Sequence, residues 1–560
     1  ILPVAFSFAS SLAFLVTGLK IPLPQWIGTK IGTHAIVIKP IGTELVPSED
    51  QNRFVISLIC PVGVSIDYVE EMIAKCENVL INLKDPVLDS EIIASMFSSI
   101  SIRPGMLISE GVVFIRLVSS TDRTVTQTQI IQDVRKRLSG LAGVRPIVLD
   151  LSTQGFTPTR GFPIDFAIQG PEWKTVVDYA EKVRLRMIES GMVADVNSDY
   201  RPGMPEDQLF PDRDKTSEMN VPVKKLAFLL NVAFGGMRNG RFTDEDKRYD
   251  VRMRLLENQR DTPNLLDHLH IRQEIPLTAG VNPPTIPIND LSQHKTISTL
   301  PLINRYNHLR KIEITANMSP GVSQGESIAR CKQIAEDVRE EMELPPSYRS
   351  VQLGNAKAMA QTIDSMWRSL VFGFLVAYMI LGIQFNSFVH PMTVLCAVPF
   401  GVTGGLLVLW ACGDTLNLMS MIGLVLLAGL VKKNSIILVD CANHFREAGK
   451  NARESMLEAG AVRLRPIMMT SLATIAGVVP LAFGFGAGAE NRGPLARSVI
   501  GGIFLSTLIT LVVVPSFYVL LEKINHWLSS LSPSIKPLPT LPPPCDSKHS
   551  NQAALQPIEV

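Results

Sequence analysis

The chain has 560 residues, of which 46% are hydrophobic and 19% are charged, and its formal net charge is +1. This composition is too apolar for an ordinary soluble protein, and a near-neutral charge without a basic stripe excludes a typical nucleic-acid interface, so we expect no nucleic-acid partner. The seven cysteines are scattered without any Cys-x-x-Cys spacing, which indicates neither a metal knuckle nor a disulfide framework.

The first residues form an apolar segment that predicts a membrane helix over residues 1–19. No basic region precedes the apolar core and no clean small-residue cleavage site follows it, which favours a membrane helix over a signal peptide. A chain that begins inside such a helix is expected to be a fragment or the second half of something larger. Residues 20–41 form a connector to which we assign no role; it contains a short repeat, Trp26-Ile-Gly-Thr-Lys-Ile-Gly-Thr33.

Residues 42–160 alternate strand and helix patterns in the order βαββαβ. Apolar residues at every second position predict strands, and apolar residues three or four apart predict amphipathic helices. The order is that of a ferredoxin-like unit. The predicted strands are 53–60, 90–97, 111–118 and 144–151, and the predicted helices are 65–80 and 126–141.

A second unit of the same kind begins at residue 161 and is interrupted. Its first part, 161–203, predicts a strand, a helix and a strand, and its second part, 306–360, predicts the remaining three elements. Residues 204–305 lie between them and read as an inserted subdomain. The predicted elements are 163–169, 172–190, 192–199, 311–318, 324–342 and 348–353.

Residues 361–522 are mostly apolar and predict five membrane helices. The connector after the third of these helices is rich in arginine and lysine, and such connectors face the cytoplasm. Alternation then places the large segment 20–366 outside and the C-terminus inside, and the proline-rich tail 523–560 is expected to be disordered. The predicted helices are 367–385, 389–411, 418–441, 466–487 and 498–521, and the basic residues are Arg446, Lys450, Arg453, Arg463 and Arg465.

Two adjacent lysines, Lys432 and Lys433, lie inside one of these apolar runs. A charge at the centre of a bilayer costs at least ~2.5–3.5 kcal/mol on insertion scales, so intramembrane charges tend to mark ion pathways and to have partners. Asp440 follows Lys433 by two helical turns on nearly the same face. The alternative is that the lysines end a shorter helix and extend to the membrane surface.

Three membrane segments form a combined pattern: Gly429–Asp440, Glu458–Ser471 and Gly484–Arg492. Together they resemble the last membrane helices of the resistance-nodulation-division (RND) efflux transporters. The soluble part resembles the same family in order. The matching segments there are Glu44–Asp50, Pro61–Ser65, Arg160–Pro171, Ala233–Gly236 and Arg248–Arg254.

The resemblance is to the C-terminal half of the family, of the hydrophobe and amphiphile efflux type. It implies a polytopic α-helical membrane protein with a large α+β periplasmic region, made of ferredoxin-like βαβ porter subdomains at 42–160 and at 161–203 with 306–360, and an inserted docking subdomain at 204–305. It implies a bacterial inner-membrane location, and a proton-driven pump for amphiphilic compounds such as drugs, detergents and dyes. The implied partners are an N-terminal half with an acidic pair, further copies in a homotrimer or heterotrimer, a periplasmic adaptor and an outer-membrane channel.

The resemblance also assigns a proton relay to four residues. Lys433 matches the lysine that pairs with the family's two membrane aspartates, which the present chain lacks. Arg463 and Thr470 match further relay positions, and Asp440 matches an acidic one. The last three residues each have a simpler interpretation. Arg463 would be an anchor at the membrane surface, Thr470 would hydrogen-bond to the backbone of its own helix, and Asp440 would lie at a helix end near water. Lys432 is expected to extend to the surface.

By position, Ile93, Met96, Phe97 and Phe114 fall near the family's substrate cleft, where flexible apolar side chains suit promiscuous binding. The alternative is that they are inward residues of an ordinary core. Two other functions stay open: a pump half for heavy-metal cations, and a split or decayed half that acts only in assembly. The sequence contains no nucleophile–base constellation and no phosphate-binding loop, so we expect neither an enzyme nor a bound cofactor.

Overall fold

The computed structural model describes residues 19–22, 35–38, 40–85, 87–101, 107–152, 161–256, 259, 268–274, 283–484 and 489–531. The chain divides into two compact units, one of residues 42–363 and one of residues 1–41 with 364–560. The predicted membrane helix lies outside the described residues up to residue 18, and so does the predicted tail from residue 532. Within the connector, β1 (Leu19–Pro22) pairs antiparallel with β2 (Ala35–Ile38).

The first sheet has four antiparallel strands in the order β4-β5-β3-β6. This order and the two intervening helices give the ferredoxin-like topology. Alternate residues of β3 (Phe54, Ile56 and Leu58) pack against the helices to form the core, and Ser65 and Thr126 cap the helices. The elements are β3 (Arg53–Ile59), α3 (Ile66–Ile81), β4 (Ile93–Ile100), β5 (Glu110–Leu117), α4 (Gln127–Leu138) and β6 (Arg145–Asp150).

The second sheet repeats this order, with β17-β7-β16-β8 as its four main strands and β15 added to the start of β16. Its core lies between the sheet and two helices, around Tyr179 and Val338. The elements are β7 (Ile164–Gly170), α5 (Trp173–Glu189), β8 (Val193–Ser198), β15 (Arg305–Tyr306), β16 (Leu309–Met318), α11 (Gln324–Glu341) and β17 (Arg349–Gln352).

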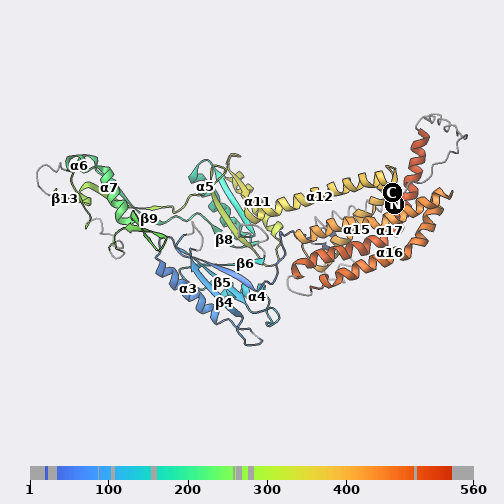
Figure 1. Cartoon of the computed structure of the whole chain (residues 1–560), viewed down its shortest axis with the longest axis horizontal. Coiled ribbons are helices and arrows are strands. Elements are labelled where there is room, and N and C mark those ends of the chain that lie inside the picture. Colours follow the sequence, from blue (N-terminus) through green and yellow to red (C-terminus); the bar gives the residue numbers. More distant parts are fainter. Residues whose placement is uncertain are drawn as a thin grey trace, which may run out of the picture. The chain divides into compact units, whose positions relative to one another are not determined.

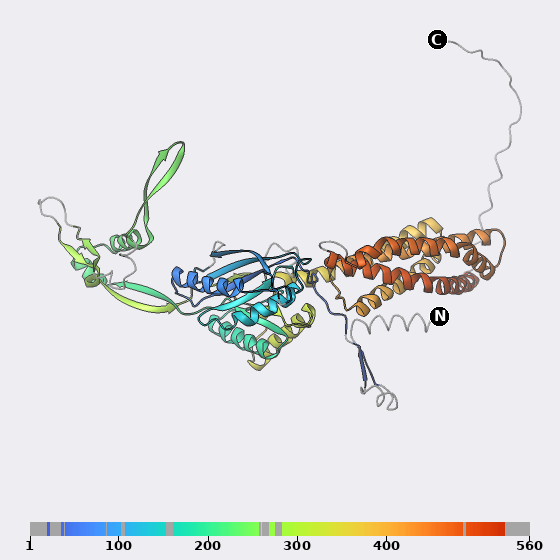
Figure 2. The ribbon, with the colours of Figure 1, turned by 90° about the horizontal axis from the view of Figure 1, so that it is seen from below.

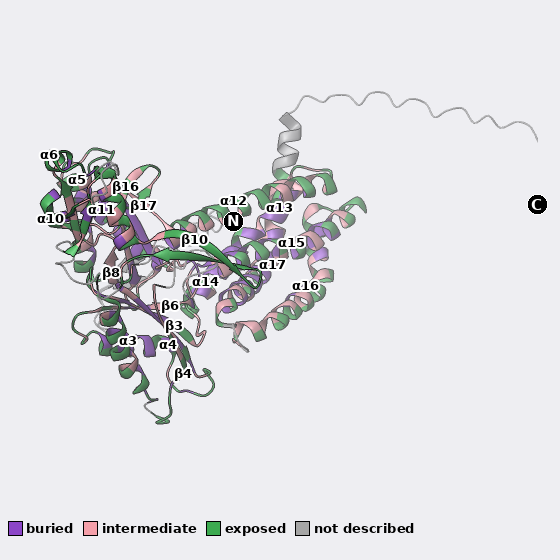
Figure 3. Ribbon diagram, turned by 60° about the vertical axis from the view of Figure 1, so that its left-hand side comes forward, coloured by how far each residue is buried: buried purple, intermediate pink, exposed green. Residues whose placement is uncertain are grey.

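The interruption between β8 and β15 is an inserted segment that leaves and returns through a two-stranded ribbon of β9 and β14. A small apolar cluster that includes Leu226, Ile271 and Ile288 forms its own core. The hairpin of β10 and β11 projects from it (Figure 2) and is exposed along most of its length (Figure 3). The elements are β9 (Met204–Pro211), α6 (Arg213–Glu218), α7 (Val223–Leu230), the π-helix η2 (Asn231–Gly235), β10 (Met237–Asp244), β11 (Lys247–Met253), β12 (His270–Arg272), β13 (Thr285–Pro287), α10 (Ile288–Leu291) and β14 (Ser292–Thr299).

The apolar unit is a bundle of long helices (Figure 1). Within the described part of the chain, five helical segments are long and apolar enough to cross a membrane: Gly354–Phe385, His390–Cys412, Leu418–Glu447, Ala452–Ala482 and Glu490–Lys523. The elements are α12 (Gly354–Phe385), α13 (His390–Leu395), α14 (Ala397–Cys412), α15 (Leu418–Glu447), α16 (Ala452–Ala482) and α17 (Ala489–Leu531).

Several of these helices extend beyond their predicted bounds; α12, for example, begins at Gly354 rather than at 367. Helix α16 begins at Ala452 rather than at 466, because its first turns are helical but too polar to be recognised from apolar composition. Helix α17 runs from Ala489 to Leu531, so the start of the tail predicted to be disordered is helical. The chain has no proline between Pro515 and Pro533, and nothing in its sequence stops the helix earlier.

Glycines bring α14 and α17 into close contact. A Cβ atom added at Gly404 would lie 2.7 Å from the carbonyl oxygen of Gly501 and 2.7 Å from the Cβ of Leu505. A Cβ added at Gly502 would lie 2.0 Å from a methyl carbon of Leu427 on α15. Small residues at such crossings let helix backbones approach, which is a common basis of packing between membrane helices.

We therefore expect Gly404→Val to destabilise the bundle, because the added side chain would force α14 and α17 apart. Overpacking of this kind typically costs about 1–3 kcal/mol. The matched control is Gly477→Val on α16, where an added Cβ would have no neighbour within 4 Å. Thermal unfolding of the purified variants in detergent checks the prediction, and equal midpoints for both would contradict it.

A second prediction concerns Asp165, which is only 6% exposed on the face of the second sheet away from its helices. Burial, followed by the nearby charge of Glu313, raises the pKa of Asp165 from 3.8 to about 7, while Lys311 opposes the shift and Asp199 adds to it. The folded protein therefore keeps the Asp165 proton up to a higher pH than the unfolded chain does. The stability that this proton contributes is fully present below about pH 4 and is lost as the pH rises towards about 7. We expect Asp165→Asn to remove that loss and to raise the unfolding midpoint at about pH 8 more than at about pH 5. If the variant and the unmodified protein differed in unfolding midpoint by the same amount at both pH values, the effect would not come from the titration of Asp165.

Candidate functional site

The two adjacent lysines lie within α15, which starts at the capping residue Asn417 and continues past both of them. Lys433 is exposed and Lys432 is half-buried. Among the described residues Lys433 has no hydrogen-bond or ion-pair partner. Asp440 is exposed as well, and its position seven residues later puts it on nearly the same side of the helix. The structure therefore presents Lys433 and Asp440 together on one open face of α15.

The other two predicted relay residues lie on α16. Arg463 is half-buried, and its Nε has no hydrogen-bond partner within the described residues. The Thr470 hydroxyl donates to the carbonyl oxygen of Ile467, at 3.1 Å, in its own helix. A hydrogen bond from a helical threonine to its own helix backbone is the simpler alternative to a relay role. Here the acceptor lies three residues earlier rather than four.

A buried polar chain that the sequence analysis did not find joins three helices. The Asn434 side-chain nitrogen donates to the hydroxyl of Ser471 at 3.1 Å, and the hydroxyl of Thr507 lies 3.0 Å from the same oxygen. All three residues are less than 9% exposed. Asn434 and Ser471 directly follow Lys433 and Thr470 in the sequence, and one residue along a helix is a rotation of about 100°. The inward hydrogen bond of Asn434 thus turns Lys433 towards the outer face.

A second candidate site is a cavity of about 800 Å³ in the first ferredoxin-like unit. Three of the predicted substrate residues line it: Met96, Phe97 and Phe114. Phe97 and Phe114 face each other across β4 and β5, with ring centroids 6.1 Å apart. Phe97 is 63% exposed, whereas Phe114 is half-buried. These rings form an apolar wall that a ligand can cover.

The fourth residue proposed for substrate binding, Ile93, does not line this cavity. The register of β4 and β5 shifts between Ile93 and Ser95, so that Ile93 lies opposite Leu117 and packs against the core. Without this bulge, strict alternation would have placed Ile93 on the same face as Phe97. A bulge carries no clear signal in a single sequence.

The cavity also contains two cationic side chains that the sequence analysis missed, Arg53 on β3 and Arg116 on β5. They lie directly opposite each other in the antiparallel pair. The Arg53 guanidinium donates to the side-chain oxygen of Gln51, at 3.2 and 3.0 Å. Arg116 is exposed and has no hydrogen-bond or ion-pair partner among the described residues. The sequence did contain a signal for Arg116. Residues two apart in a strand lie on the same face, so Arg116 had to lie on the same face of β5 as Phe114.

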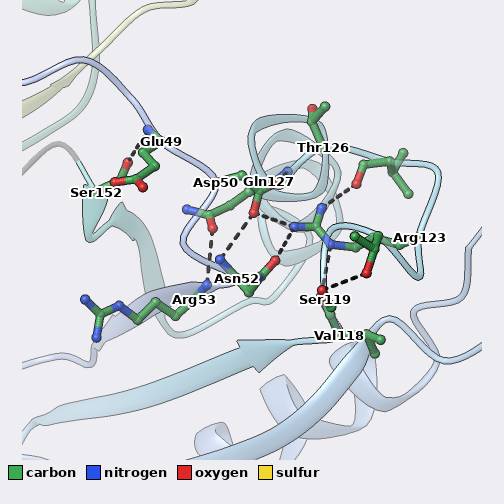
Figure 4. A network of polar contacts seen from close by, with 12 residues as sticks. Glu49, Asp50, Asn52, Arg53, Val118, Ser119, Arg123, Thr126, Gln127 and Ser152 are labelled. Carbon is green, nitrogen blue, oxygen red and sulfur yellow. Dashed lines mark hydrogen bonds and ion pairs between the residues drawn. The ribbon is translucent and has the colours of Figure 1, made fainter. Parts of the chain in front are cut away.

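A buried ion pair supports the loop that leads into β3 (Figure 4). The Arg123 guanidinium pairs with Asp50, and it donates to Asn52 at 2.8 Å and to the carbonyl oxygen of Val118 at 3.2 Å. The Arg123 side chain is 2% exposed and that of Asp50 is 15% exposed. The second oxygen of Asp50 accepts the backbone NH of Gln127 at 3.0 Å. This network fixes the entry to β3 and neutralises the Asp50 charge beside the cavity.

Comparison with known proteins gives a consistent set of relatives. Residues 7–522 match the model of the AcrB/AcrD/AcrF family. The multidrug resistance protein MdtC of Yersinia pseudotuberculosis serotype O:1b (strain IP 31758) is 28% identical over 429 residues, which are 76% of this chain and 41% of that protein. The MdtC of Yersinia pestis matches to the same extent. A crystal structure of a heavy metal efflux pump has the same fold, with a TM-score of 0.71 and 19% identity over 93% of this chain and 53% of that one.

The loop network generates a stability prediction. Arg123→Ala would leave Asp50 buried without its partner, and breaking a buried pair in this way costs about 3–5 kcal/mol. The matched control is Arg137→Ala, which removes an exposed pair with Asp133 and is expected to cost less than about 1 kcal/mol. Thermal unfolding, with hydrogen exchange over residues 49–53, would measure both. Similar behaviour of the two variants would mean that the network does not support the loop.

Proposed function

The chain belongs to the AcrB/AcrD/AcrF family, and from this membership we propose that it is the C-terminal half of a proton-driven pump that exports amphiphilic compounds across the bacterial envelope. The family match confirms the resemblance to RND efflux transporters. The chain spans less than half the length of the curated relatives it matches and about half of the solved pump chain.

The proposed location is the bacterial inner membrane. Five helical segments of sufficient length and apolar composition support a multi-pass arrangement. Arg446, Lys450 and Arg453 gather where α15 ends and α16 begins, which favours a cytoplasmic position for this turn. The large unit of residues 42–363 is then periplasmic, with the segment 204–305 as its docking part, and the C-terminus is cytoplasmic.

The observation that carries the coupling proposal is the open position of Lys433 on an apolar helix. An ammonium group there requires an anionic partner, and the proposed N-terminal half would supply the acidic pair. A lysine close to two carboxylates lowers their pKa, and protonation of one carboxylate weakens its hold on the lysine. Movement of α15 on this release would be transmitted through the Asn434–Ser471–Thr507 chain. Arg463, Thr470 and Asp440 are proposed as further relay positions.

The proposed substrate site is the cavity beside Phe97 and Phe114. Its aromatic wall suits a varied apolar ligand, because contact with ring faces and edges is not restricted to one shape. The two arginines in the same cavity disfavour cations, and this argues against the alternative of a heavy-metal pump. The solved heavy-metal pump is similar in fold at 19% identity, which carries no information about cargo. A role in assembly alone is the remaining alternative.

The proposed assembly follows the family: an N-terminal half, a trimeric arrangement of complete pumps, a periplasmic adaptor and an outer-membrane channel. The strands β10 and β11 of the hairpin are exposed, which makes them available for contacts outside the chain. We propose no residue-level contact for the hairpin.

In a complete pump, we expect Lys433→Ala to abolish export, because the acidic pair would lose its counter-charge. Lys432→Ala is the matched control one position away, and it is expected to keep most of the activity. Accumulation of a fluorescent amphiphile in cells, with membrane protein levels measured alongside, tests both variants. Unchanged export by Lys433→Ala would reject the relay, and lack of export by the unmodified complex would favour the assembly role.

A further inference from the structure

The charges of the cavity in the first ferredoxin-like unit are all of one sign. Among the described residues that line it, Arg53 and Arg116 are the charged side chains, and none carries a carboxylate. We propose that this cavity selects anionic amphiphiles: the two arginines bind a sulfate, sulfonate or carboxylate head group, and Phe97 and Phe114 cover the apolar body. This inference rests on the proposed function, since it names the substrate class of the same site.

The arrangement of the arginines supports an anion between them. Arg53 and Arg116 are directly opposite on neighbouring antiparallel strands, and their side chains leave the same face of the sheet. Like charges in such a pair destabilise the sheet. A bound anion would remove this repulsion and would accept hydrogen bonds from two planar guanidinium groups, whose forked geometry matches carboxylate and sulfate oxygens.

Neither guanidinium is neutralised by the protein in the described structure. Arg53 donates to Gln51, whose side chain is a neutral amide, and Gln51 in turn donates to Glu49 at 3.2 Å. Glu49 does not line the cavity. Asp50, a carboxylate of the same loop, is already paired with Arg123. The cavity therefore keeps two positive charges that are free to bind a ligand.

The apolar part of the ligand would lie on the aromatic wall. Phe97 is 63% exposed, so its ring is accessible to a ligand. The register places Ser95 opposite Arg116 and Phe97 opposite Phe114. A cationic end and an apolar end therefore follow each other along one face of the same two strands. This polarity matches an amphiphile with one negative head group.

The experiment compares two probes with the same labelled chain and head groups of opposite charge: dansyl-labelled undecanoate and dansyl-labelled undecyl trimethylammonium. Binding of each to the purified full chain in lipid nanodiscs is followed by fluorescence, against empty nanodiscs. We expect the anionic probe to bind more tightly. An exposed ion pair changes affinity by up to about fivefold, so Arg53→Ser with Arg116→Ser should reduce the preference by up to about twenty-five-fold.

Two further variants make the result interpretable. Arg137→Ser removes an exposed arginine of the same unit that lies outside the cavity, and it should keep the preference. Arg53→Lys with Arg116→Lys keeps the charges and should retain most of it, and this guards against a general effect of changing β3 and β5. The inference would be overturned if the unmodified chain bound both probes equally or bound neither. It would also be overturned if the preference survived in the double serine variant or was lost in the double lysine variant.

Transport is measured separately, with the complete pump in proteoliposomes under a proton gradient. Selective binding without proton-dependent transport would reject the proposed function and leave the charge selectivity standing. Transport of both probes at equal rates, with Phe114→Ala lowering both, would support the pump and reject the selectivity.

Discussion

Asn434, Ser471 and Thr507 hydrogen-bond to one another where three long apolar helices meet. Such groups have few other partners in apolar surroundings, and leaving them unpaired is costly. Their bonds therefore set the rotation of α15, α16 and α17 about their own axes. That rotation determines the direction of the other side chains of these helices. Lys433, for example, points outward because the adjacent Asn434 points inward.

In the two ferredoxin-like units the corresponding rule for strands holds, because successive residues of a strand face opposite sides of the sheet. In β3, the residues Phe54, Ile56 and Leu58 build the core, and this leaves Arg53 on the opposite face. The same alternation in β5 puts Ile115 in the core and leaves Phe114 and Arg116 on the other side. A stable core and a chemically distinct open face thus come from the same short strands. The buried Arg123–Asp50 pair then holds the loop from which β3 starts.

Much of this architecture could be predicted from local pattern. Apolar periodicity located the strands and helices of both ferredoxin-like units to within a few residues, and the interruption of the second unit was visible in the order of its elements. Composition alone could not reveal the polar first turns of α16, nor the helical start of the tail. Of the four residues proposed for substrate binding, Met96, Phe97 and Phe114 line one cavity, whereas Ile93 does not, because a bulge changes its side. The buried chain of Asn434, Ser471 and Thr507 depends on which helices are neighbours, and a single sequence does not contain that information.

The ribbon of β9 and β14 has a consequence for the way the large unit is organised. Its register pairs Met204 with Thr299, so the two points where the inserted segment begins and ends are separated by only one strand spacing, about 5 Å. The second ferredoxin-like unit therefore accommodates roughly a hundred additional residues without displacing any of its own strands. An insertion attached in this way behaves as a module: its length, its loops and its hairpin can change independently, while the sheet that carries it keeps the same connections. Variation among related chains is thus expected to concentrate beyond the ribbon, and the sheet below it is expected to tolerate little.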